Sequence, residues 1–135
     1  IHELGHVLAA LAFRTEQSTI NVGSGIPLIK GKIGKVRFNI RCLVFHGAHS
    51  INERKDEFSD HQKAWICLGG PLLNAIVFFL LFLTPSFDRF SPVTLFYLFN
   101  GYLAIANLIP FRIKEKKSDG YRFIQCIKND GTRRG

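Results

Sequence analysis

Two long apolar stretches without a charged residue dominate the pattern of hydrophobic and polar positions along the chain. Residues 64–84 read AWICLGGPLLNAIVFFLLFLT, and residues 92–111 read PVTLFYLFNGYLAIANLIPF. With a rise of 1.5 Å per residue, each would form a helix about 30 Å long, which matches the hydrocarbon core of a bilayer. A shorter apolar segment at the start of the chain ends at Arg14. The pattern therefore predicts a mainly α-helical membrane protein with three membrane helices, the first of which (residues 1–13) is truncated.

The polar region between the first two apolar segments, residues 14–63, contains strand patterns. Residues 35–42 alternate between polar and apolar side chains, which is typical of a half-buried strand. Weaker strand patterns at residues 18–22 and 26–29 are separated by glycines and a proline. We therefore expect a small β-sheet in the loop between the first and second helices.

The composition is both hydrophobic and basic. Of the 135 residues, 47% are hydrophobic, and 18 Lys and Arg against 10 Asp and Glu give a net charge of +8. All of these cations except Arg89 lie in residues 14–63 or in the tail at residues 112–135. By the positive-inside rule, the long loop and the basic tail lie in the cytoplasm, and the protein is a multi-pass protein of the cell membrane. This topology accounts for the charge, so we expect no nucleic-acid partner.

The chain begins with Ile1 and contains no Met. We therefore expect residues 1–135 to be the single core domain of a longer membrane protein.

Residues 2–6 read HELGH, an H-E-x-x-H motif at the start of an apolar helix. Positions i and i+4 share one face of a helix, so His2 and His6 can bind one metal ion. Glu3 is adjacent and well placed to accept a proton from water bound to that metal. Two imidazoles, an open coordination position and a general base are what zinc-dependent hydrolysis requires. Because ionisable groups in an apolar helix are costly and usually functional, the motif predicts a Zn²⁺ site with Glu3 as the catalytic base.

A third protein ligand is needed to complete such a site. The third apolar stretch ends on the same side of the membrane as the first, and Asp119 follows it shortly. Gly120 comes next and would let the backbone turn the carboxylate inward. Asp119 is therefore the geometric choice, while His46 and His49 in the polar loop are the competing ligands and are expected to be surface histidines.

Three motifs together resemble the site-2 proteases, a family of zinc metalloproteases with an active site inside the membrane. The motifs, in the order of that family, are HELGH at residues 2–6, LGGPLLN at 68–74, and NLIP at 107–110 followed by DG at 119–120. The resemblance implies a three-helix core with a small sheet at the membrane surface. It also implies the zinc ligands His2, His6 and Asp119, with Glu3 as the base. Eight residues, many of them charged, separate Pro110 from Asp119, so Asp119 must return to the site after a cytoplasmic excursion.

Three asparagines lie within the apolar stretches. Asn74 follows Gly70 by four residues, and Asn100 and Asn107 share a small, polar helix face with Ala104. All three could form hydrogen bonds between helices, and we expect this of Asn100. The family resemblance favours substrate binding for Asn74 and Asn107, which would hold the substrate backbone or the scissile carbonyl.

The sequence thus predicts an intramembrane zinc endopeptidase whose partners are the lipid bilayer and membrane-associated substrates. The alternative is a non-catalytic binding or chaperone module that retains the protease fold, although such a module would not need Glu3. We also expect the strand at residues 36–42 to offer an exposed edge that captures the unwound substrate by strand addition.

Overall fold

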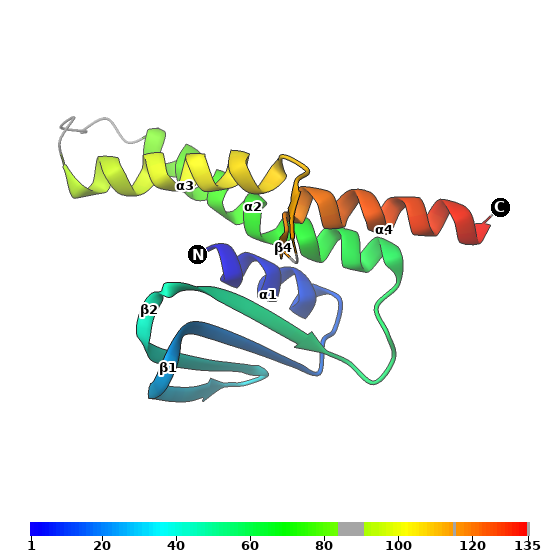
Figure 1. The fold of residues 1–135 in the computed structure, drawn as a ribbon, viewed down its shortest axis with the longest axis horizontal. Helices are drawn as coiled ribbons and strands as arrows, with labels where there is room; N and C mark the ends of the chain where they lie inside the picture. The colour runs from blue at the N-terminus through cyan, green and yellow to red at the C-terminus, as the bar shows by residue number, and fades with distance from the viewer. Residues whose placement is uncertain (84–90, 115, 135) are drawn as a thin grey trace.

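The computed structural model describes residues 1–83, 91–114 and 116–134 (Figure 1). Arg89, the one cation expected between the second and third helices, lies outside the described residues. The elements in chain order are α1 (His2–Ala12), β1 (Gln17–Ile33), β2 (Val36–Glu53), α2 (Asp60–Phe82), α3 (Pro92–Leu108), β3 (Arg112–Ile113), β4 (Lys116–Lys117) and α4 (Asp119–Arg134).

The predicted core of three membrane helices is wrong. Among the described helices, only α2, with 23 residues, is long and apolar enough to cross a membrane by length and composition. Helix α1 has 11 residues and α3 has 17. Helix α3 ends at Leu108 rather than at residue 111 because Ile109 precedes Pro110, and a residue before proline disfavours the helical conformation. Ile109 accordingly has an extended backbone, with ψ of 123°.

The structure also contains more sheet, and one more helix, than the sequence predicted. Strands β1 and β2 have 17 and 18 residues and fill most of the region in which a small sheet was expected. The expected tail forms helix α4, whose 16 residues begin at Asp119. The described residues therefore combine four helices with an extended β-sheet.

Helix α2 is the central element, because it contacts α1, α3 and α4. In Figure 1, α3 runs beside the later half of α2 and α4 runs beside its earlier half. Helix α1 lies on the opposite side of α2, and the sheet lies beyond α1. Helices α1 and α4, which lie near opposite ends of the sequence, therefore both pack against α2.

The start of α2 is fixed by its own sequence. Ser59 Oγ accepts a hydrogen bond from the backbone N–H of Gln62, while Gln62 Oε1 accepts one from the backbone N–H of Ser59. This reciprocal capping box satisfies two N–H groups that the first helical turn leaves unpaired. Arg54 then ties the preceding loop to the end of α1, since its guanidinium donates to the carbonyl of Phe13 at 3.0 Å.

The two long strands bend and pair with each other more than once. Residues 29–33 form a hairpin with residues 36–40, and residues 17–22 pair antiparallel with residues 48–53. Residues 18–22 also pair with residues 36–40, with both residue numbers rising together. The bend in β1 falls at Gly23 and Gly25, which both have positive φ.

This pairing places the alternating strand in the middle of the sheet. Residues 36–40 have a paired neighbour on each side, so they do not form the exposed edge that the sequence predicted. Among the described residues, segment 48–53 is paired only with residues 17–22 and is an edge of the sheet.

Candidate metal centre

Helix α1 brings His2 and His6 together as their spacing predicts. The two Nε2 atoms are 3.2 Å apart, and the rings meet edge to face with their centroids 4.7 Å apart. His6 is buried, and His2 is partly exposed. The i and i+4 positions therefore present two imidazole nitrogens to one point beside the helix.

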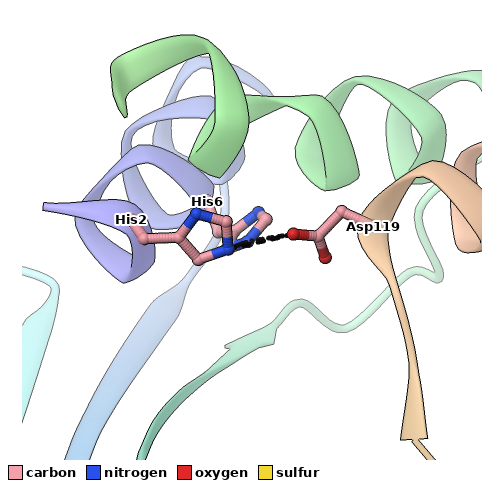
Figure 2. A group of neighbouring side chains, drawn as sticks. All are labelled: His2, His6 and Asp119. Carbon is pink, nitrogen blue, oxygen red and sulfur yellow. Dashed lines mark hydrogen bonds and ion pairs between the residues drawn. The ribbon is translucent and has the colours of Figure 1, made fainter. Parts of the chain in front are cut away.

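Asp119, the first residue of α4, completes the group. Its Oδ2 lies 2.9 Å from Nε2 of His2 and 3.4 Å from Nε2 of His6. Figure 2 shows the three side chains converging, the histidines from α1 and the carboxylate from the start of α4. Burial acts to raise the pKa of Asp119, but hydrogen bonds from the two histidines outweigh it and lower the pKa to about 2. The carboxylate is therefore ionised at neutral pH.

The charged spacer before Asp119 returns to the site through a small hairpin. Strands β3 and β4 pair, and the backbone N–H of Ser118 donates to the carbonyl of Phe111 at 3.0 Å. Ser118 Oγ accepts from the N–H of Phe111 at 3.0 Å and donates to the carbonyl of Ile109 at 2.8 Å. The same oxygen accepts from the N–H of Tyr121 at 3.2 Å, as an N-cap residue does. Ser118 therefore closes the hairpin and starts α4 at once.

Gly120 acts differently from the prediction. Its φ is not among the positive values in the described chain, so no unusual turn is made there. Instead, a Cβ at Gly120 would overlap the carbonyl oxygen of Leu108. Gly120 thus allows the start of α4 to pack directly against the end of α3.

The three donor atoms fit a zinc ion. Their separations of 2.9, 3.2 and 3.4 Å are close to the edge of about 3.3 Å expected for a tetrahedron with zinc–ligand bonds of about 2.0 Å. Two neutral imidazoles and one carboxylate are also a donor set that zinc prefers in catalytic sites. Of the described side chains, these three form the group that could hold a metal ion. His49 lines the adjoining cavity without joining the group, and the side chain of His46 lies outside the described residues.

Glycines on both helices allow α2 to form the back wall of the site. A Cβ at Gly69 would lie 2.9 Å from Ala9 Cβ and would overlap the Gly5 carbonyl. A Cβ at Gly70 would lie 2.5 Å from Nε2 of His6 and 2.8 Å from Cε1 of His2. The Gly-Gly pair of the predicted motif therefore provides the close helix contact and the space for both rings.

Groups on α2 also contact the Nδ1 atoms of both histidines. The sequence did not predict these contacts. Nδ1 of His6 lies 2.7 Å from the carbonyl oxygen of Ile66 and 3.3 Å from the backbone nitrogen of Gly70. The shorter contact favours a proton on Nδ1, donated to the carbonyl. Nδ1 of His2 lies 3.2 Å from the side-chain nitrogen of Asn74, which is fully buried. Every residue has a backbone carbonyl, so the sequence could not single out Ile66 as a partner of His6. Asn74, in contrast, could be noticed as a polar residue in an apolar stretch.

A cavity of about 690 Å³ opens beside the three donors. Glu3 lines it together with the two histidines and Asp119. Asn107 also lines it, and its side-chain nitrogen donates to the carbonyl of Leu103 in its own helix at 2.9 Å. Asn74 is not among the lining residues, so its predicted contact with substrate stays a prediction without support from its position. The sheet edge borders the cavity through residues 48–50 and 52.

This metal-binding arrangement coincides with a family match. The model of peptidase family M50 matches residues 1–87, which include the two histidines, Glu3 and the glycine pair. The chain belongs to peptidase family M50. This is the site-2 protease family, so the resemblance seen in the motifs is confirmed. The family is zinc-dependent and membrane-embedded.

Two curated relatives agree with this assignment. A Chlamydia trachomatis serovar D protein named "Putative zinc metalloprotease" is 29% identical to this chain, with 69% of this chain and 20% of the relative covered. A Chlamydia pneumoniae protein of the same description is 35% identical, with 47% of this chain and 10% of the relative covered. The chain therefore spans a fifth or less of the length of these relatives.

Proposed function

We propose that this chain is the catalytic core of a zinc endopeptidase that cleaves membrane-associated proteins within or beside the bilayer. The observation that carries the proposal is the placement of Glu3 on the same cavity as a zinc-compatible group of two imidazoles and a carboxylate. Family M50 membership supports peptide hydrolysis as the reaction.

The outer surface of the helices supports action at a membrane. Only 17% of the apolar window of α2 is buried inside the protein. Large apolar side chains on α2 and α3 are instead exposed, among them Phe79, Leu80, Leu95, Phe99 and Ile105. An exposed apolar surface of this extent marks a site of contact with a membrane or another protein. We propose that the later half of α2, with α3 packed beside it, enters the bilayer, and that the basic loop and α4 face the cytoplasm.

In the proposed reaction, His2, His6 and Asp119 would hold the metal. Zinc bound there would act as a Lewis acid on the scissile carbonyl and would lower the pKa of water. Glu3 accepts the proton of the attacking water and passes it to the nitrogen of the leaving amine. Asn107 lines the cavity, which supports a contact with the substrate backbone as part of this proposal.

Substitution Glu3→Gln in the protein reconstituted in lipid vesicles tests this function. The change keeps the size of the side chain and the three metal donors, so bound zinc should remain near one per chain. Cleavage of a set of single-span membrane peptides, followed by mass spectrometry, should fall by about 100-fold or more. Glu16→Gln is the matched control, because Glu16 is exposed and does not line the cavity. Undiminished cleavage by Glu3→Gln would contradict the proposed base, and zinc binding without cleavage by the unsubstituted protein would favour the non-catalytic module.

A further inference from the structure

Helix α2 provides a hydrogen-bonding partner for the Nδ1 atom of each imidazole of the site. Their Nε2 atoms both lie near Oδ2 of Asp119, so both Nδ1 atoms point away from the donor group. Nδ1 of His6 meets the Ile66 carbonyl, and Nδ1 of His2 meets the amide of Asn74. A histidine that binds a metal through one nitrogen usually donates its other N–H to an acceptor, which fixes its tautomer and ring orientation.

The chemistry of His2 decides what its partner must be. If Nε2 binds the metal, the ring is neutral and its proton is on Nδ1. The side-chain NH₂ of Asn74, 3.2 Å away, carries only donors, so it cannot accept that proton. An acceptor is required at this position, as the Ile66 carbonyl provides for His6.

Asn74 itself has the missing acceptor. Its Oδ1 is buried without a hydrogen-bond partner among the described residues, and the whole residue is 0% exposed. A rotation of the amide by 180° exchanges Oδ1 and Nδ2 within the same volume. This one rotation removes the donor–donor contact and places Oδ1, an acceptor, opposite Nδ1 of His2.

We infer that Asn74 is a positioning residue that accepts a hydrogen bond from Nδ1–H of His2 and so aims Nε2 of His2 at the metal. This inference rests on the proposed zinc site. Asn74 can reach His2 because Gly5 and Gly69 bring α1 and α2 into contact and Gly70, one turn before Asn74, leaves room for the rings. Its absence from the cavity lining separates this role from a contact with the substrate.

Two substitutions with opposite hydrogen-bonding properties test the inference. Asn74→Leu keeps the volume but removes the acceptor, and it should weaken zinc binding by about 10- to 100-fold. Asn74→Asp offers only acceptors, and it should bind zinc within a few-fold of the unsubstituted protein. Zinc affinity is measured by competition with a chromophoric chelator. Asn100 supplies matched controls, since it is a buried asparagine that donates to Phe96 in α3, and Asn100→Leu should leave the zinc affinity unchanged.

The outcomes separate this inference from the proposed function. If the unsubstituted protein binds no zinc, the proposed function fails. If it binds zinc and Asn74→Leu binds as tightly, or Asn74→Asp weakens binding as much as a lost ligand, the inference is overturned while the site stands. Should Asn74→Leu not fold, Asn74→Asp still decides, together with the ¹⁵N NMR spectrum of the zinc-loaded protein. That spectrum should show the His2 proton on Nδ1, and a proton on Nε2 would overturn the inference.

Discussion

Oδ2 of Asp119 lies 2.9 Å from Nε2 of His2, although these residues are near opposite ends of the chain. The contact depends on α2, which packs against both α1 and α4, and on the hairpin that returns the charged spacer to the site. The metal centre is therefore a product of the whole helical arrangement and not of the H-E-x-x-H segment alone.

Removing the carboxylate should leave a two-histidine site. We expect Asp119→Ala to weaken zinc binding by more than about 100-fold. Losses up to that size are expected when a residue that only hydrogen-bonds to a metal ligand is removed. Asp130→Ala is the matched control, because Asp130 lies on the same helix and pairs with His61 at 3.0 Å, outside the donor group. Both variants are compared by chelator competition. Tight zinc binding by Asp119→Ala would show that another residue is the third ligand.

Ser118 should matter for stability as well as for the site. Ser118→Ala removes the N-cap of α4 and leaves the N–H of Phe111 without its acceptor. Together these losses should lower the free energy of unfolding by about 2 kcal/mol or more, and zinc affinity should fall because Asp119 is the next residue. Thr132→Ala, which removes only an exposed hydroxyl bonded to Lys128 one turn earlier, should change stability by no more than about 0.5 kcal/mol. Denaturation in detergent measures the free energy of unfolding of both variants. Equal stability of the two variants would contradict the double role of Ser118.

The space at Gly70 should be indispensable. In Gly70→Ala, the new methyl group would lie 2.5 Å from Nε2 of His6, so the ring or the helix must shift. Overpacking of this kind costs about 1–3 kcal/mol and should also abolish tight zinc binding. Gly131→Ala in α4 is the control, since a Cβ there meets nothing within 4 Å and alanine favours a helix. A Gly70→Ala protein with unchanged zinc affinity would refute the close packing.

The parts of the site that depend on local sequence could be predicted. His2 and His6 are one helical turn apart in any α-helix, and the glycine pair belonged to the motif recognised at residues 68–74. Asp119 could be proposed as a ligand, but its path back to the site depends on hydrogen bonds of Ser118 over several residues. The Ser-Asp-Gly order was the available signal, because serine before a helix is a common N-cap.

The larger fold could not be predicted as well, for identifiable physical reasons. Hydropathy found the apolar stretches, but it took no account of Pro110, which helps to end α3 early. The alternating pattern of residues 36–40 shows only that one face of the strand is apolar. Which two segments pair with this strand is determined by contacts across the sheet, which the pattern does not reveal. Helix α4 was missed because its many charges resemble a solvated tail.

Zinc itself should stabilise the protein, because a ligand that binds only the folded state shifts the unfolding equilibrium. At a free zinc concentration 100 times the dissociation constant, the gain is about 2.7 kcal/mol, which should raise the Tm by several degrees. A strong chelator should reverse the shift. His2→Ala should abolish it, whereas His61→Ala should retain it, because His61 pairs with Asp130 away from the donor group. Differential scanning fluorimetry in detergent measures all four conditions. A zinc-dependent shift that persists in His2→Ala would place the stabilising ion somewhere other than this centre.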